Sequence, residues 1–432
     1  MTPNPKIVQS VEKLNYRVTV GDVAAQAGLE LNFAQQGLLA LASEAEGHLQ
    51  VAESGDVVYL FPKNFRSILR NKHWQLRWQQ TWQKIWRVLF YIIRISFGIV
   101  LIASIVLMLA AILVIIVAAN SSSDEREGGS RGYGGGYGGG FFVPRFWIGD
   151  IFWWFDPGYN RRRRLRRRQT AGYQMNFLES VFSFLFGDGN PNADLEEYRW
   201  QAIGSVIRNN KGSVVGEQIA PYVDEIDQYE DYMIPVLSRF NGYPEVSPQG
   251  DIVYYFPELQ VMASRRQAEP LPANGCLQEK LWRFSQASGG QITLAASLGI
   301  LNIILAFVLE ILLQDGQIAA ELGGVVALAD SLSWFLLGYG ILYLLIPLIR
   351  SFWIQGCNPK IIKRNQAREQ RAIALARPDL SLQQKLAYAD KFAKQKIISD
   401  RDITYTTEND LLDQNILNAD KIDRDWQKRI DG

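Results

Sequence analysis

The chain has 432 residues, of which 48% are hydrophobic, and its formal net charge is +1. This near-neutral balance excludes a protein that binds nucleic acid through a generally basic surface. Two cysteines are too few for a disulfide framework. Together with the two histidines, they could complete the ligands of a zinc or iron–sulfur site only with distant residues or a second subunit. We therefore expect no cofactor, no metal and no catalytic site.

Residues 1–65 predict a small domain of helices and strands. Lys6–Leu14 is apolar at helical spacing, and residues 21–27 and 32–44 predict two further helices. Strands are expected at residues 49–52 and 57–61, around a turn that contains Gly55. The order of helix, short strand, two helices and β-hairpin resembles a winged-helix domain.

Residues 66–118 predict an amphipathic linker and a first transmembrane helix. The apolar run 89–117 exceeds the roughly 20 residues that span a bilayer. The linker before it carries tryptophans four residues apart, with a basic residue at the membrane end: Trp74, Trp78, Trp82, Trp86 and Arg87. Because indole rings favour the membrane–water interface, we interpret this stripe as an anchor rather than as a pigment site.

Residues 119–140 are glycine-rich and predict a flexible linker, and residues 141–190 return to the membrane. The aromatic run 141–155 is short for a span, so it is either a re-entrant or an interfacial segment. A block of seven arginines follows: Arg161, Arg162, Arg163, Arg164, Arg166, Arg167 and Arg168. We expect this block to bind anionic lipid headgroups, and binding of nucleic acid is the alternative interpretation. Residues 176–186 predict an amphipathic helix that lies on the membrane surface.

Residues 194–260 repeat the first domain. Residues 215–257 align with residues 20–62 at a constant offset of 195 and without a gap, and the hairpin GDVVYLFP recurs as GDIVYYFP. We therefore expect a second winged-helix-like domain, and with it an α+β integral membrane protein in which two such cytoplasmic domains accompany a small bundle of transmembrane helices.

Nucleic-acid binding is disfavoured by the charge of these domains. The predicted third helix of the first domain has no lysine or arginine, and residues 194–258 hold twelve acidic residues against four basic ones, whereas affinity for phosphate needs cations. One acidic run is either a solvated face or a docking surface for a basic protein partner: Asp224, Glu225, Asp227, Glu230 and Asp231.

Residues 276–350 predict a basic-aromatic linker, with Trp282 and Arg283, and a hairpin of two transmembrane helices at 292–313 and 322–349. Residues 351–432 predict a helical tail. Basic residues cluster before the first span and after the third, which places both ends of the chain in the cytoplasm.

Four segments carry a resemblance to a known family: FWWFDP at 152–157, the arginine block 161–168, MNFLESVFSFLFGDGNPN at 175–192 and VVGEQIAPYVD at 214–224. They are similar to uncharacterised membrane proteins of cyanobacteria and plant chloroplasts, some of which carry an iron–sulfur-biosynthesis label that the residues here do not support. The resemblance implies a cyanobacterial thylakoid or plasma membrane, with both domains and the C-terminus in the cytoplasm.

We therefore predict a non-enzymatic membrane scaffold or assembly factor that recruits protein partners through paired acidic domains, during biogenesis of a photosynthetic membrane complex. A membrane-tethered nucleic-acid-binding regulator is the alternative, and a transporter or an iron–sulfur-related factor comes third. The oligomeric state stays open.

Overall fold

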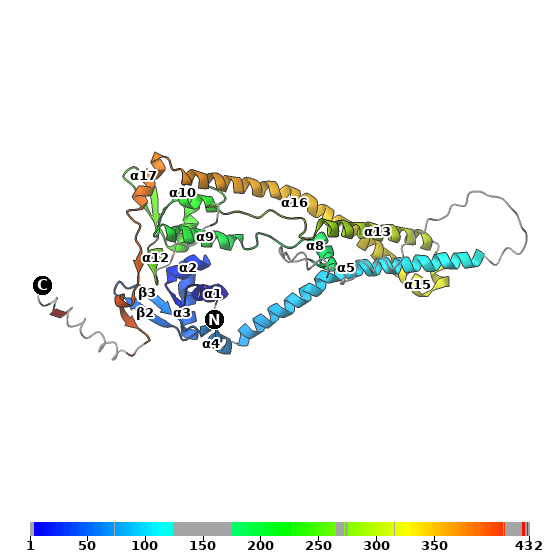
Figure 1. Ribbon diagram of the computed structural model, residues 1–432, viewed down its shortest axis with the longest axis horizontal. Coiled ribbons are helices and arrows are strands. Elements are labelled where there is room, and N and C mark those ends of the chain that lie inside the picture. The colour runs from blue at the N-terminus through cyan, green and yellow to red at the C-terminus, as the bar shows by residue number, and fades with distance from the viewer. Residues whose placement is uncertain are drawn as a thin grey trace, which may run out of the picture. The chain divides into compact units, whose positions relative to one another are not determined.

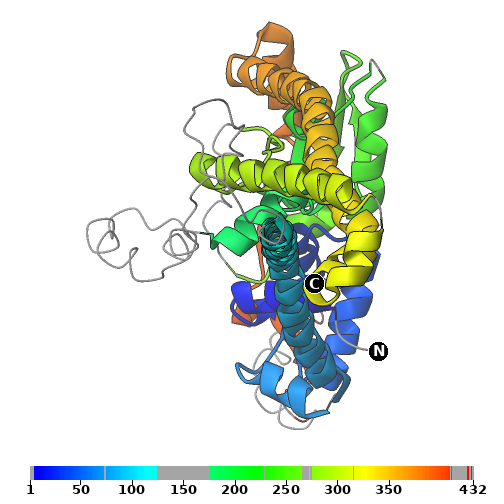
Figure 2. The same cartoon turned by 90° about the vertical axis from the view of Figure 1, so that its right-hand side faces the viewer.

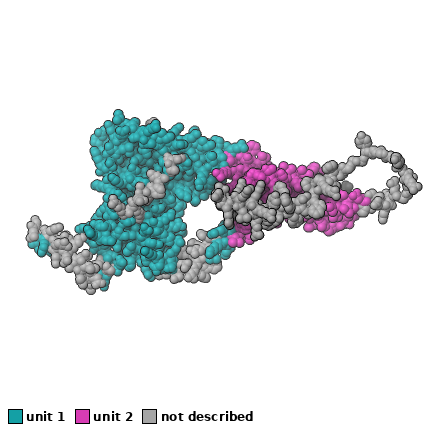
Figure 3. Space-filling view, viewed as in Figure 1, with its two compact units in different colours: residues 1–87, 190–282, 355–432 teal, residues 88–189, 283–354 magenta. Residues whose placement is uncertain are grey.

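The computed structural model describes residues 4–123, 175–264 and 275–408, apart from 73, 228 and 315, together with residues 272, 410, 426, 427 and 430. The chain divides into two compact units (Figure 3). Unit 1 comprises residues 1–87, 190–282 and 355–432, and unit 2 comprises residues 88–189 and 283–354. All described strands belong to unit 1, so the protein mixes helix and sheet, as expected.

Unit 1 begins with a first module, residues 5–60. Its elements are α1 (Pro5–Lys13), β1 (Arg17–Val18), α2 (Val20–Ala27), α3 (Leu31–Glu44), β2 (His48–Ala52) and β3 (Val57–Leu60) (Figure 1). The side chains of Thr19 and Asp22 cap the start of α2, and Gly28 ends this helix at a φ of 63°. The three strands pair antiparallel in the order β1-β3-β2.

The second module, residues 195–255, has the same order of elements. They are α9 (Leu195–Asn209), β4 (Ser213–Val215), α10 (Gly216–Ile219), η2 (Ala220–Tyr222), η3 (Asp231–Met233), α11 (Ile234–Phe240), β5 (Tyr243–Val246) and β6 (Ile252–Tyr255). Its sheet order β4-β6-β5 matches that of the first module. The hairpin register also matches, because Tyr243 pairs with Tyr255 where His48 pairs with Leu60, and both residues are shifted by 195.

The two modules share one hydrophobic core. Helix α2 of the first packs along α9 of the second, and the buried residues of both form one continuous cluster. The helices approach closely because Gly204 has no side chain: a Cβ there would lie 2.9 Å from the Cα of Ala25. At the same interface Arg208 of α9 pairs with Asp22 of α2, and both side chains are buried. The copies are therefore packed as one body.

The C-terminal tail runs along both modules and carries strands as well as helices. Helix α17 (Leu380–Ala389) packs on β4 and β6. Strand β8 (Lys396–Ile397) pairs in parallel with β7 (Val261–Met262), which follows the short helix α12 (Pro257–Gln260). Strand β9 (Ile403–Thr406) then adds a fourth strand to the first module, beside β2. The helical tail predicted from the sequence omits both strands.

In the part of the chain that the structure describes, three helices are long and apolar enough to cross a membrane: residues Lys84–Asn120 within α5 (Trp74–Ser123), α13 (Gly289–Leu313) and α16 (Ser333–Ala376). Both views show α5 and α16 as long continuous helices (Figures 1 and 2). The first two predicted spans lie inside α5 and α13. The third, expected over 322–349, is broken at its start into α14 (Gln317–Leu322) and α15 (Gly324–Ser331), since Gly323 and Gly324 both have positive φ.

Unit 2 also buries α8 (Phe177–Phe186), which packs against α13. Glu179, Ser180 and Ser183 on this helix are buried. The polar side chains of α8 therefore face the interior of unit 2, and its predicted position on a membrane surface stays a prediction. Polar contacts also join the long helices of this unit, where Asn302 of α13 donates a hydrogen bond of 2.5 Å to Ser104 of α5.

Candidate partner-docking surface

The predicted membrane-anchor residues fall into three groups. Trp82, Trp86 and Arg87 are exposed on α5, as an anchor requires, and Trp74 and Trp78 lie on the same helix. Arg283 is exposed. The backbone N–H of Trp282 donates to the side-chain carbonyl of Asn358, and the side-chain amide of Asn358 donates to the backbone carbonyl of Trp282. The aromatic run 141–155 and the arginine block 161–168 lie outside the described residues.

The acidic run of the second module is held at its start by Asp224. One of its carboxylate oxygens accepts a hydrogen bond of 2.7 Å from Arg199, and the other pairs with Arg368 of α16. Arg368 also bonds Glu279, which Arg364 contacts through both of its carboxylate oxygens. These pairs join α16 to the second module, so the carboxylate of Asp224 is engaged in an internal contact although its side chain is 39% exposed.

The run is held a second time at Glu230. Lys385 of α17 contacts one oxygen of its carboxylate at 2.7 Å, and the hydroxyl of Tyr254 donates to the other at 2.8 Å. Glu230 has a φ of 56°, which is rare for a residue with a side chain. Lys385 also contacts Glu217 at 2.9 Å. The loop between Asp224 and Glu230 is therefore fixed at both ends.

What the loop displays is a mixture of acidic and apolar side chains. Glu225, Asp227 and Asp231 are exposed, and Asp227 accepts a hydrogen bond from the backbone of Asp231. Ile226 at 48% and Tyr229 at 82% exposure stand between them, and Ile234, the first residue of α11, follows at 61%. We call Glu225, Ile226, Asp227, Tyr229, Asp231 and Ile234 the display loop. Its apolar members were missed by the sequence interpretation, although they alternate with the acidic residues that it singled out.

Lowering the pH should release α16 from the second module. The hydrogen bond from Arg364 lowers the pKa of Glu279, and Arg368 and Arg199 lower the pKa of Asp224 although burial opposes them. A carboxylate with a lowered folded pKa stabilises the fold above its unfolded pKa of about 4, and this stability is lost as the pH falls through the folded value. Cys276, which is buried near Glu369 and Arg368, should then react faster with 4,4′-dithiodipyridine below about pH 4.

This experiment needs Cys357→Ser, so that Cys276 reports alone. The variant Asp224→Asn/Glu279→Gln is the control, because it should label rapidly at neutral pH and lose most of the acid dependence. If the variant and the parent keep the same pH profile, the two carboxylates do not hold α16 in place.

Three of the four basic residues of the second module are engaged inside unit 1; the fourth, Lys211, is exposed. Arg239, on the helix that would read DNA in a winged-helix protein, places its guanidinium 4.0 Å from the centre of the Trp200 ring and donates to the carbonyl of Gly28. Arg208 pairs with Asp22, and Arg199 with Glu196 and Asp224. These three cations are thus engaged by protein groups, which weighs against phosphate binding.

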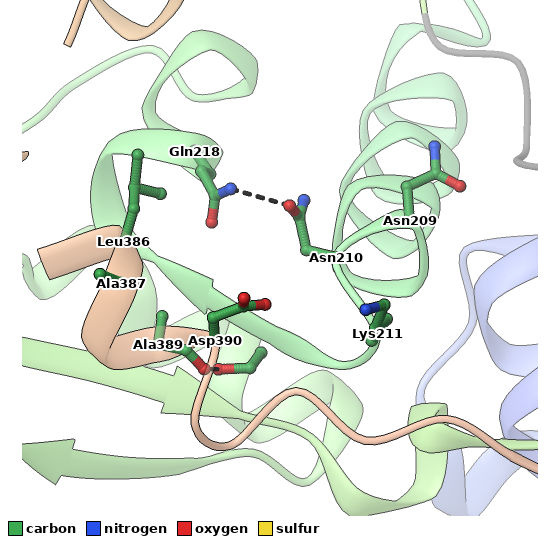
Figure 4. Close-up of a pocket in the computed structure, with 9 residues that line it drawn as sticks. Asn209, Asn210, Lys211, Gln218, Leu386, Ala387, Ala389 and Asp390 are labelled. Atoms are coloured by element: carbon green, nitrogen blue, oxygen red, sulfur yellow. Dashed lines mark hydrogen bonds between the residues drawn. The ribbon is translucent and has the colours of Figure 1, made fainter. Parts of the chain in front are cut away.

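A polar cleft of about 450 Å³ lies between α17 and the second module (Figure 4). It is lined by Asn209, Asn210, Lys211, Ser213, Gln218, Leu386, Ala387, Ala389 and Asp390. Gln218 donates to Asn210 at 2.9 Å, and Ser213 donates to the backbone of Ala389. The described lining contains no nucleophile–base pair. Within the described residues, no group of three or more His, Cys, Asp or Glu side chains is placed to hold a metal ion.

A plant protein identifies the family. The chain is 37% identical over 440 residues to the uncharacterised chloroplastic protein At5g03900 of Arabidopsis thaliana, and the alignment covers 98% of this chain and 82% of the relative. The chain belongs to the family of At5g03900. The chloroplastic relative agrees with the family expected from residues 141–224, and together with the three apolar helices it is compatible with a thylakoid membrane. No protein-family model and no solved structure matches the chain.

Proposed function

We propose that the chain is a non-enzymatic scaffold or assembly factor of a photosynthetic membrane, which recruits a protein partner through the display loop. In this proposal α5, α13 and α16 span the membrane, and the two modules are winged-helix-like domains on its cytoplasmic side. The matching element order and strand order of the modules support the winged-helix assignment. The three apolar helices and the chloroplastic relative support the location.

The display loop carries the proposal. A loop that served only as a solvated connection would not need ion pairs at both Asp224 and Glu230. The same loop exposes Tyr229 and Ile234, and exposed aromatic and aliphatic side chains beside charges are typical of binding surfaces. Because its free charges are carboxylates, a basic partner fits best, and complementary charge would speed their association.

Reversing the charge of the display loop should reduce partner recovery. We expect Glu225→Lys/Asp231→Lys to lower the amount of co-purifying membrane-complex subunits at least fivefold. Both carboxylates are exposed, and the ion pairs that hold the loop are made by Asp224 and Glu230 instead. The measurement is quantitative mass spectrometry after affinity purification from solubilised membranes at about 0.1 M salt, where the Debye length is about 10 Å.

The matched control is Glu30→Lys/Glu46→Lys in the first module. It makes the same change of charge at exposed positions, and Glu30 is the counterpart of Glu225 at the offset of 195. Equal recovery with both variants would contradict docking at the display loop. Enrichment of nuclease-sensitive DNA in place of subunits would favour the nucleic-acid-binding regulator instead.

A further inference from the structure

The outer edge of β2 in the first module holds a strand by pairing along residues 50–52, and an N–H donor lies at each end of this pairing. Leu49 donates its backbone N–H to the hydroxyl of Thr407 at 2.9 Å, and Glu53 donates its own to the carbonyl of Asp402 at 2.9 Å. Leu49 also accepts a bond of 2.9 Å from the backbone of Thr407. Between these contacts β9 pairs antiparallel with β2. An edge with free backbone groups is a template for strand addition.

The corresponding edge of the second module is closed by proline. Because the two hairpins share one register at an offset of 195, Leu49 corresponds to Pro244 and Glu53 to Pro248. Proline has no N–H, so the donors at both ends of the pairing in the first module are missing from the second, whereas Val246, the counterpart of Val51, keeps its N–H. The hydroxyl of Tyr388 also donates to the carbonyl of Val246 on this edge. One copy of the hairpin is thus protected against strand addition, and the other accepts a strand.

The segment 399–408 is held by its backbone and by a few side-chain contacts at the surface: the hydroxyl of Thr404 donates to the carbonyl of Val51 at 3.1 Å, and Asp400 pairs with Arg17 at 3.3 Å. Of its side chains, Ile403 packs on the small cluster of Ala52, Val58, Ala263 and Ile398, while Thr404 and Tyr405 are exposed. The firm attachment of the tail lies earlier, at Ile398, which is 1% exposed and whose backbone bonds Met262 and Arg17. Segments with few buried contacts open at low free-energy cost. Residues 399–408 can therefore leave the edge while the rest of the tail stays attached.

We propose that the outer edge of β2 is a strand-binding site for an extended segment of a protein partner, which replaces β9 in the same antiparallel register. Such a segment needs an aliphatic residue at the position of Ile403, and a backbone N–H at the position of Thr407. Recognition by strand addition draws its affinity from main-chain hydrogen bonds and its specificity from such side-chain positions. The site assumes, with the proposed function, that the protein has partners, but it does not involve the display loop.

The test weakens the resident strand and offers the same strand from outside. In the full chain, Thr407→Pro removes both the N–H that donates to Leu49 and the hydroxyl that accepts from it, without changing the edge itself. A fluorescent peptide of residues 399–408 should bind this variant saturably, with a Kd at least tenfold lower than for the wild type, in which β9 competes. The readout is fluorescence anisotropy of the detergent-solubilised protein. The same peptide with proline at the position of Thr407 should not bind.

The double variant Leu49→Pro/Thr407→Pro gives the first module the proline that stands on the edge of the second, and it should abolish binding of the peptide. The second module carries proline at this position in the same register, so the substitution suits the local backbone. Glu53→Pro serves as an independent second variant, and hydrogen exchange at Val58 of β3 checks that the sheet remains folded. Folded Thr407→Pro protein that binds no peptide would overturn the proposal, as would binding that survives Leu49→Pro.

A different outcome would reassign the occupant. If the wild-type chain forms a dimer that Leu49→Pro abolishes, the edge binds the tail of a second copy, and the proposal of a partner segment fails. A failure of either kind leaves the charge-reversal test of the display loop unaffected, since that loop belongs to the other module.

Discussion

Replacing Arg208 by methionine should lower the free energy of unfolding of unit 1 by about 3–5 kcal/mol. Arg208 and Asp22 form an ion pair in which the side chains are 4% and 0% exposed. Removal of the cation leaves the Asp22 carboxylate buried without its charged partner, and an uncompensated buried charge is expensive. Because the pair joins α2 to α9, both helices should lose protection against hydrogen exchange in the full chain, measured in detergent under native conditions.

The control separates the buried charge from the packing of the arginine. Asp22 also accepts hydrogen bonds from the backbone of Thr19 at 2.9 Å and of Ala263 at 3.1 Å. The double variant Asp22→Asn/Arg208→Met keeps a carbonyl oxygen for these donors and leaves no charge behind. It should recover at least half of the lost stability. If the double variant is as unstable as Arg208→Met alone, the loss arises from packing and the role assigned to the ion pair is wrong.

Local features of the fold follow from the sequence because they depend on neighbouring residues. The turn at Gly55, which has a φ of 85°, and the apolar alternation around it predict the hairpin of β2 and β3. Helix α2 covers the residues 21–27 for which a helix was predicted, and it begins at the capping pair of Thr19 and Asp22. The repeat at an offset of 195 extends these predictions to the second module, whose hairpin keeps the register.

The remaining features depend on contacts between distant residues. Strand β9 is four residues long and forms only because β2 offers an edge about 350 positions earlier, so no local pattern distinguishes it from a loop. The shared core of α2 and α9 needs the close approach at Gly204, which periodicity does not reveal. The break between α14 and α15 depends on Gly323 and Gly324, whose neighbours are apolar enough to predict one uninterrupted span.

The candidate site was predictable in composition but not in arrangement. The acidic run 224–231 stands out in the sequence, yet the structure divides it by function. Asp224 and Glu230 bind cations from α16 and α17, more than 100 residues later in the chain, and Glu225, Asp227 and Asp231 remain at the surface. Charge alone cannot separate these groups, because all five residues carry the same kind of side chain and only tertiary packing supplies their partners.

Replacing Gly21 by alanine should destabilise unit 1 by about 3 kcal/mol or more. Small-to-large substitutions in a packed core cost most when backbone atoms, rather than a side chain, must move to make room. A Cβ at this position would lie 2.1 Å from the carbonyl oxygen of Glu258, in α12. That oxygen belongs to the backbone and cannot rotate away. Alanine would therefore push α2 from α12, at the place where the first module meets the second, and hydrogen exchange should show lost protection in both helices.

Gly356→Ala is the matched control, because no atom lies within 4 Å of its Cβ position on α16. There the gain in helix propensity should stabilise the helix by up to about 1 kcal/mol. Gly216, the counterpart of Gly21 in the second module, provides the intermediate case, since a Cβ there would lie 2.5 Å from a carboxylate oxygen of Glu230. That oxygen is at the end of a side chain, so Gly216→Ala should cost less than Gly21→Ala and should disturb the display loop rather than the module interface. If the three variants are equally stable, close backbone approach at Gly21 does not hold the modules together.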